Sequence, residues 1–252
     1  ADLLLTPELS LCGYPPEDLL LRPDFYRSVD LALVALTQDT VDLDIAIVVG
    51  HPEQAGAHYY NAASVLYQGK RLCTYRKQHL PQYEVFDELR YFTAGGESVV
   101  FDHAGTRFGL AICEDIWFAA PAQAAKAAGA EVLLVLNASP YHLDKTVDRQ
   151  SVLAQRVAET GLSIVYCNLV GGQDELVFDG ASCLVAADGQ TVLQLPQFAE
   201  DMATADLSDA GDWHTQAALT PLTELNAQIY NAMVLGVRDY FAKNGFAGAY
   251  LG

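Results

Sequence analysis

The chain has 252 residues, 51% of them hydrophobic, and its 32 acidic against 14 basic residues give a net charge of −18. The length suits one large α/β domain, or one domain with a short appendage, and no apolar run approaches the roughly 20 residues of a membrane-spanning helix. The acidic balance argues against a nucleic-acid partner, because phosphate binding needs a basic surface.

The first half of the chain predicts short strands around one amphipathic helix. Residues 3–5 are typical of a strand that leads into a loop at Glu8. Apolar residues recur at helical spacing through 22–38, which predicts a helix with one buried face. Five more strands are predicted in this half, at 45–49, 62–67, 71–75, 99–102 and 106–112.

The second half mixes β-α-β units with hairpins. Helices are predicted at 121–129 and 147–160, and strands at 132–137, 163–168, 181–186 and 190–195. This is not the strict alternation of a dinucleotide-binding fold, and no G-x-G-x-x-G occurs. Two layers of mixed sheet with helices outside fit the order better.

The pattern weakens at residues 199–220, where we predict a linker or mobile loop. After Pro221, apolar residues at helical spacing predict a long helix that ends near Lys243. Because the chain opens without Met and almost directly on the strand predicted at 3–5, we expect further residues before Ala1 in the natural protein.

The five cysteines are an odd number and include no C-x-x-C pair. That argues against both a disulfide framework and a zinc site. Reduced thiols, together with a start that lacks the basic and apolar regions of a signal peptide, predict a cytoplasmic protein.

Three residues that can do chemistry follow predicted strands: Glu8, Lys77 and Cys113. A turn after a strand presents Cys113 outward and leaves the next N–H free as an oxyanion donor. A thiol also needs a base or a cation nearby to react as a nucleophile. Taken singly, the three could be a loop carboxylate, a solvated lysine and a core cysteine. Their shared place at strand ends, where α/β sheets form sites, favours a common site.

The stretches around these residues, 6–14, 75–81 and 111–117, resemble the glutamate, lysine and cysteine motifs of the nitrilase, or carbon–nitrogen hydrolase, superfamily. The resemblance implies an α/β fold, a four-layer α-β-β-α sandwich of two mixed sheets. It makes Glu8 the general base, Cys113 the nucleophile and Lys77 an oxyanion stabiliser whose charge would lower the thiol pKa. It also implies that Glu88 is a catalytic carboxylate and that the site holds no metal. Five substrate-binding residues are implied as well: Tyr83, Glu114, Trp117, Ser139 and Lys145.

Further stretches, 13–20, 81–88, 137–141 and 169–180, are similar to the glutaminase domains of bacterial glutamine-dependent NAD synthetases. Residues 229–240 and 246–252 resemble the start of the synthetase half. The resemblance divides the chain into a hydrolase domain at 1–198, a linker at 199–220 and a truncated second domain at 221–252.

This narrower resemblance implies that L-glutamine is hydrolysed through a cysteine thioester, with no cofactor in the glutaminase domain. The released ammonia would amidate nicotinic acid adenine dinucleotide at a second domain that uses ATP and Mg²⁺. Members of the superfamily commonly assemble, so a homo-oligomer is expected.

Two other readings stay open. A stand-alone nitrilase-superfamily amidase acting on another small amide would share Glu8, Lys77 and Cys113, but it leaves the chain from Pro221 onward unexplained. A non-enzymatic interaction domain would have no use for the three intact residues.

Overall fold

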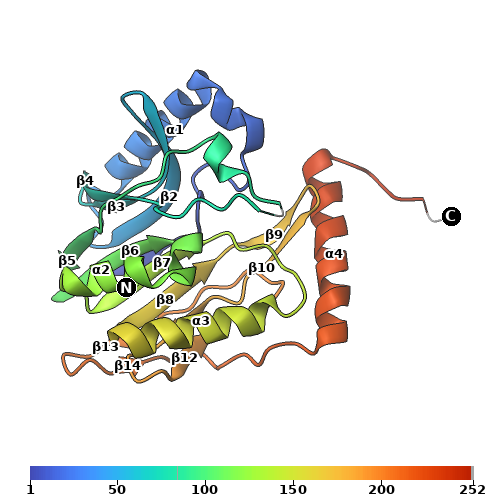
Figure 1. The fold of residues 1–252 in the computed structure, drawn as a ribbon. Helices are drawn as coiled ribbons and strands as arrows, with labels where there is room; N and C mark the ends of the chain where they lie inside the picture. The colour runs from blue at the N-terminus through green and yellow to red at the C-terminus, as the bar shows by residue number, and fades with distance from the viewer. Residues whose placement is uncertain (84, 251–252) are drawn as a thin grey trace.

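The computed structural model describes residues 1–83 and 85–250. Two β-sheets pack face to face, with helix α1 outside one sheet and helices α2 and α3 outside the other (Figure 1). The predicted four-layer α-β-β-α sandwich is therefore confirmed. Three residues lie outside the described part of the chain. They are residue 84, in the stretch 81–88 that resembles the glutaminase domains, and residues 251–252, in the stretch that resembles the start of the synthetase half.

The first sheet has four strands in the order β1-β2-β3-β4. Its strands are β1 (Leu3–Leu5), β2 (Ala46–Ala55), β3 (His58–Tyr67) and β4 (Lys70–Arg76). β1 runs parallel to β2, and the other pairs are antiparallel. Helix α1 (Pro23–Asp39) follows a short 3-10 helix, η1 (Glu17–Leu21), and buries Leu33 against this sheet. Pro23 opens α1, a position where the missing N–H of proline costs nothing.

The second sheet has six strands in the order β12-β11-β8-β7-β6-β5. They are β5 (Val100–His103), β6 (Thr106–Ile112), β7 (Val132–Asn137), β8 (Ser163–Asn168), β11 (Cys183–Val185) and β12 (Thr191–Gln194). The three central strands are parallel and are connected by helices α2 (Ala119–Ala127) and α3 (Lys145–Thr160). All six residues of β7 are buried, as expected of a strand covered on both faces.

The main core lies between the two sheets, where Val48 and Val65 of the first meet Ile112 and Leu134 of the second. The sheets also approach each other at one end. The backbone N–H of Glu8, just after β1, donates to the carbonyl of Asn137, the last residue of β7, at 3.4 Å. The carboxyl ends of strands from both sheets therefore meet at one place.

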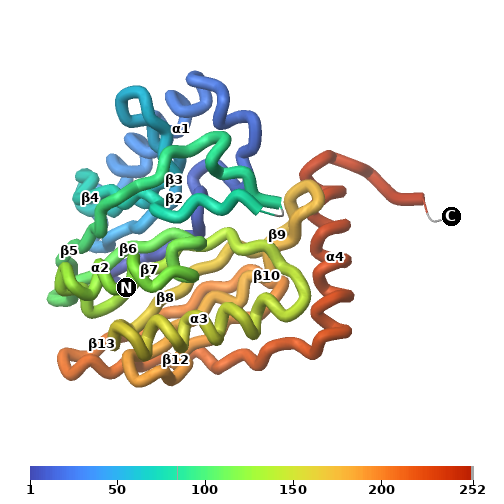
Figure 2. Tube along the Cα trace, viewed as in Figure 1, coloured from blue at the N-terminus to red at the C-terminus, as the bar shows by residue number. Residues whose placement is uncertain are grey.

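A hairpin of β9 (Val170–Gln173) and β10 (Leu176–Asp179) extends from this end, and helix α4 (Leu225–Asn244) packs along it (Figures 1 and 2). The sequence pattern did not predict the hairpin. Between the second sheet and α4, the predicted linker carries a small strand pair, β13 (Asp206–Leu207) and β14 (Trp213–His214).

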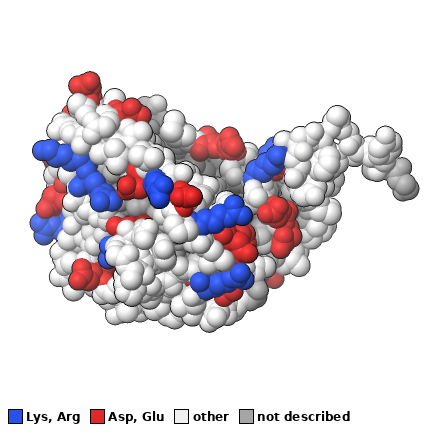
Figure 3. Space-filling view, turned by 90° about the horizontal axis from the view of Figure 1, so that it is seen from above, with Lys and Arg blue, Asp and Glu red and all other residues white. Residues whose placement is uncertain are grey.

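Acidic and basic side chains are interspersed on the face drawn in Figure 3, so that face carries no continuous basic patch. Among the described residues, no helix combines the length and the apolar character needed to cross a membrane.

Candidate active site

A buried ion cluster occupies the end of the sandwich where the two sheets meet. The Lys77 ammonium lies 2.8 Å from Glu8 Oε1 and 2.7 Å from Glu88 Oε1. The side chains of Lys77 and Glu8 are both 0% exposed. Cys113 is buried beside them, and its titration depends on all three charges. The structure thus brings together the four residues predicted to be catalytic.

Glu8 is held from both sheets. Its Oε1 accepts a hydrogen bond from Asn61 Nδ2 of β3 at 2.7 Å, and its Oε2 accepts one from the Ala138 N–H, just after β7, at 3.0 Å. The loop that carries Glu8 crosses β2 at Gly50, where a Cβ atom would lie 2.5 Å from the backbone nitrogen of Leu9. No larger residue fits there without moving this loop.

Lys77 directly follows β4. Its backbone N–H donates to the Asn61 carbonyl at 2.8 Å, and its carbonyl accepts from the Gly95 N–H at 2.7 Å. Asn61 therefore bonds both the backbone of Lys77 and the side chain of Glu8. Asn61 was not predicted, because an asparagine inside a strand gives no local sign of its partners.

Cys113 follows β6 and opens a 3-10 helix, η3 (Cys113–Trp117). Its φ of +44° lies in the left-handed region, where residues with a side chain are strained. Such strain is common where a fold presents a reactive side chain at a sharp turn. The Glu114 N–H follows at the start of η3, where backbone donors lack a partner within the helix.

The charge states follow from burial and from the neighbouring charges. Burial disfavours the charged form of Lys77, but Glu8 and Glu88 outweigh it and raise the lysine pKa well above its usual value. Burial raises the pKa of Cys113 well above normal, Glu8 adds to this, and Lys77 only partly opposes it. The Lys77 charge lowers the thiol pKa, as expected, but burial and the two carboxylates outweigh it, so the net shift of the Cys113 pKa is upward. The resting sulfur is a protonated thiol.

Glu88 is the titratable member of the cluster near neutral pH. Burial raises the pKa of its carboxyl to about 7, and Lys77 opposes the shift. The Tyr14 hydroxyl donates to Glu88 Oε1 at 3.4 Å. Tyr14 and Glu88 also line an apolar cavity together with Leu9, Leu20, Phe86 and Phe92.

Four of the five predicted substrate-binding residues form two pairs beside this cluster. The Tyr83 hydroxyl donates to both carboxylate oxygens of Glu114, at 3.0 and 2.9 Å. The Lys145 ammonium lies 4.4 Å from the centre of the Trp117 ring, within reach of a cation–π contact. Burial raises the pKa of Glu114, opposed by the Tyr83 hydrogen bond and by two lysine charges.

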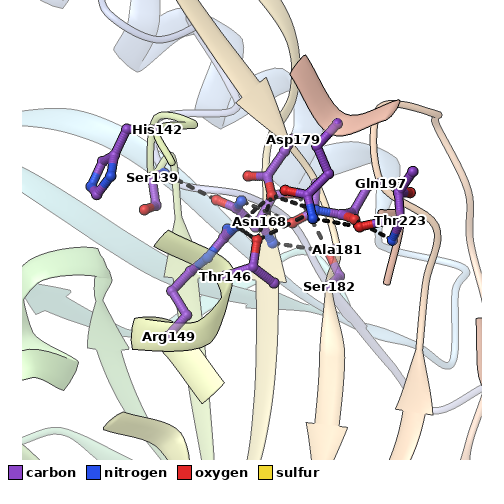
Figure 4. A network of polar contacts seen from close by, with 12 residues as sticks. Ser139, His142, Thr146, Arg149, Asn168, Asp179, Ala181, Ser182, Gln197 and Thr223 are labelled. Carbon is purple, nitrogen blue, oxygen red and sulfur yellow. Dashed lines mark hydrogen bonds and ion pairs between the residues drawn. The ribbon is translucent and has the colours of Figure 1, made fainter. Parts of the chain in front are cut away.

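Ser139, the fifth predicted residue, is buried in the loop after β7. Its backbone N–H donates to Asn168 Oδ1 at 3.0 Å (Figure 4). The preceding residue, Ala138, contacts the Glu8 carboxylate. This loop therefore borders the site, held in place by a polar network that the sequence did not predict.

Comparisons with known proteins agree with this geometry. The family model for carbon–nitrogen hydrolases matches residues 1–215. The chain is 44% identical over 261 residues to the glutamine-dependent NAD(+) synthetase of Xanthomonas campestris pv. campestris, covering 100% of this chain and 46% of that protein. The corresponding protein of Thermotoga maritima is 37% identical, with 100% and 50% covered. The chain thus spans about half the length of the curated relatives it matches.

Solved structures give the same picture. The glutamine-dependent NAD+ synthetase of Acinetobacter baumannii, in complex with ADP, matches with a TM-score of 0.94 and 39% identity, covering 99% of this chain and 47% of that one. An amidase from Nesterenkonia sp. AN1, with acrylamide added at its active site cysteine, matches with a TM-score of 0.69 and 30% identity, covering 78% and 76%. The present chain belongs to the carbon–nitrogen hydrolase family.

Proposed function

We propose that this chain hydrolyses the side-chain amide of L-glutamine and provides ammonia for the ATP-dependent amidation of nicotinic acid adenine dinucleotide. The observation that carries the proposal is the buried Glu8–Lys77–Glu88 cluster beside Cys113. Similarity over the whole chain to glutamine-dependent NAD(+) synthetases supports the choice of glutamine. The step that uses ATP and Mg²⁺ would belong to the part of those relatives that this chain does not span.

In the first half-reaction, Glu8 accepts the thiol proton of Cys113 while Sγ attacks the amide carbon of glutamine. The carbonyl oxygen becomes an oxyanion. Glu8 then returns the proton to the amide nitrogen, the C–N bond breaks, and ammonia leaves a thioester on Cys113. In the second half-reaction, Glu8 takes a proton from water, whose oxygen attacks the thioester carbon. The C–S bond then breaks, glutamate leaves, and Glu8 returns its proton to the Cys113 sulfur, which restores the thiol.

The oxyanion has two proposed donors. An ammonium group has three N–H donors, and two of those on Lys77 bind Glu8 and Glu88. Among the described residues the third has no acceptor, so we assign it to the developing charge, and the Glu114 N–H would supply the second donor. Each such donor is worth about 3–4 kcal/mol in acyl-transfer enzymes.

The two side-chain pairs beside the cluster suit the charged end of glutamine. Glu114, oriented by Tyr83, offers a carboxylate to the α-ammonium group. Lys145, packed over Trp117, offers an ammonium to the α-carboxylate. The loop at Ser139 would close the remaining side.

We also retain the proposed division into a hydrolase domain at 1–198, a linker at 199–220 and the start of a second domain at 221–252. α4 exposes Met233 (59%) and Val237 (60%) to solvent, as expected of a helix that packs against further protein. A homo-oligomer remains part of the proposal.

The test uses the intact natural polypeptide. Cys113→Ala should lower glutamine-dependent NAD synthesis by about 10⁴-fold, as expected for loss of a nucleophile, and should spare synthesis from added ammonium. A diazo-ketone analogue of glutamine should label Cys113, located by mass spectrometry of the digested protein. Cys73→Ala, at a half-buried thiol of β4, is the matched control and should keep both activities. Labelling of a cysteine other than Cys113 would contradict the assignment.

The second candidate is a stand-alone amidase, favoured by the match to the Nesterenkonia amidase across 76% of that chain. Steady-state kinetics on glutamine, asparagine and simple aliphatic amides separate the two functions. A higher kcat/KM for an amide without charged α-groups than for glutamine would favour this candidate.

A further inference from the structure

Asp115 is a fully buried carboxylate that the mechanism above does not use. Its Oδ1 accepts hydrogen bonds from the backbone N–H groups of Gln78 at 3.0 Å and His79 at 2.8 Å. Its Oδ2 accepts one from the Tyr75 hydroxyl at 2.8 Å. These donors lie on both sides of Lys77 in the chain, so one carboxylate holds the segment that carries the catalytic lysine.

The same carboxylate also holds the nucleophile turn. Asp115 lies two residues after Cys113 in η3, and its Oδ2 accepts the backbone N–H of Ile112 at 3.0 Å. The carboxylate thereby closes the turn in which Cys113 adopts its strained φ of +44°. Four donors from two distant stretches of chain converge on one side chain.

The main effect of these hydrogen bonds is to fix the position of Lys77 relative to Cys113. Hydrogen bonds to an ionised carboxylate are short and directional, and this group has no exposure to water that could replace them. Lys77 and Cys113 stand at the ends of different strands in different sheets, β4 and β6. Asp115 bridges the segments that carry them, 36 to 40 residues apart in sequence.

We propose that Asp115 is a positioning residue that sets the Lys77 ammonium relative to the Cys113 sulfur through these four hydrogen bonds. The inference rests on the proposed amide hydrolysis at Cys113. Asp115 does not touch substrate in this scheme. Without the Asp115 carboxylate, the Lys77 ammonium would move relative to the oxyanion that it stabilises. A displacement of about 1 Å at a reacting centre can cost on the order of 100-fold in rate.

Asp115→Asn tests the inference in the intact natural polypeptide. Each carboxylate oxygen of Asp115 accepts two hydrogen bonds, and in Asn an NH₂ group, which is a donor, replaces one of these oxygens. Two of the four hydrogen bonds are then lost, and the segments that carry Lys77 and Cys113 are no longer held together in the same way. We expect kcat for glutamine to fall about 100-fold, while KM and the dissociation constant of glutamate stay within about threefold. Asp102→Asn, at an exposed carboxylate of β5 that pairs with Arg107, is the matched control and should keep wild-type kinetics.

A purely structural role would give a different result. It would lower the melting temperature and the fraction of folded enzyme, but kcat per folded molecule would stay at the wild-type value and overturn the inference. If Asp115→Asn does not fold, Tyr75→Phe removes only one of the four donors. We then expect kcat to fall about fivefold to tenfold at constant KM, and an unchanged kcat in the folded variant would equally overturn the inference.

The proposed function fails separately from this inference. Wild-type protein without glutaminase activity, or Cys113→Ala with full activity, would contradict the proposed hydrolysis itself. Wild-type activity in folded Asp115→Asn, with an inactive Cys113→Ala, would contradict only the role of Asp115.

Discussion

Glu88 ties the charge of the site to pH. Burial raises the pKa of its carboxyl to about 7, and the Lys77 ammonium beside it opposes the shift. As pH falls through this value, Glu88 gains a proton and loses its attraction for Lys77. Between the ordinary glutamate pKa and about pH 7, the folded state holds a proton on Glu88 that the unfolded chain has lost. The free energy of unfolding therefore falls as pH rises through this range. The site thus keeps an ionised Glu88 at a cost in stability.

Glutamine hydrolysis should therefore rise with pH along an acidic limb with an apparent pKa near 7. Glu88→Gln removes the titrating group. The acidic limb of the variant's pH–rate profile should therefore move by about one pH unit or more, and the variant's kcat should fall. Initial rates between pH 5 and 9, scanned at saturating glutamine, measure both effects. Asp24→Asn changes a carboxylate of α1 whose side chain is 87% exposed, and its profile should overlay the wild type. An unmoved limb in Glu88→Gln would assign the titration to another group.

At the scale of elements, a buried polar network joins α3 to β10 and to the segment before α4 (Figure 4). Arg149 of α3 forms an ion pair with Asp179 of β10, and both are almost completely buried. Gln197 Nε2 donates to Asp179 at 3.3 Å, and Gln197 Oε1 accepts from the Thr223 N–H at 2.9 Å. α3 begins at Lys145, which we propose binds the substrate. A network that anchors α3 therefore also helps to position Lys145.

Asp179→Asn should destabilise the protein by about 3–5 kcal/mol, because it leaves the Arg149 charge buried without its partner. We also expect a higher KM for glutamine, since the first turn of α3 can then shift, with a smaller change in kcat. Urea denaturation and steady-state kinetics measure the two effects. Asp102→Asn alters an ion pair with Arg107 in which both side chains are exposed, and it should change the free energy of unfolding very little. Equal losses in the two variants would contradict the special role of the buried pair.

The elements differ in how far the sequence predicts them. β6, β7 and β8 have the predicted bounds, because buried parallel strands are continuous apolar runs. The β9–β10 hairpin was missed because Gly171 and Gly172 break any apolar alternation. Its partner α4 also lies far along the chain, since Gly172 bonds Asp239 at a separation of 67 residues. The motifs predicted the residues that we propose to be catalytic, and the structure brings these residues together. They did not give Asn61 or Asp115, whose partners are assembled only by the folded sheets.

At the scale of the whole molecule, α4 is attached through a narrow contact with the hairpin. A Cβ atom on Gly172 would lie 3.0 Å from the Cα of Gly236, so the two backbones pass in direct contact. The Gly172 N–H donates to Asp239 Oδ2 at 2.7 Å, and its carbonyl accepts from Lys243 Nζ at 2.6 Å. Only Ala232 and Leu235 of the helix are buried. The hydrogen bonds around Gly172, together with a small apolar cluster at Ala232 and Leu235, therefore hold α4 in place.

Gly172→Val should release α4 while leaving the sandwich folded, because the new side chain collides with the backbone of the helix. Hydrogen exchange followed by mass spectrometry should show amides of α4 exchanging at least about tenfold faster, with β7 unchanged. Gly248→Val, at a glycine whose Cβ would meet no atom within 4 Å, serves as the control. Unchanged protection of α4 in Gly172→Val would show that other contacts hold the helix.

The burial of Cys113 also affects how fast this cysteine is oxidised. Peroxides attack thiolates, and burial raises the pKa of this thiol well above its usual value. Burial also raises the pKa of Cys12, Cys167 and Cys183 to about 12 and that of Cys73 to about 11. All five sulfurs therefore rest in the form that oxidises slowly. In the proposed mechanism Cys113 becomes reactive only when Glu8 removes its proton, so the protein without substrate should withstand mild oxidation in the absence of a reducing agent.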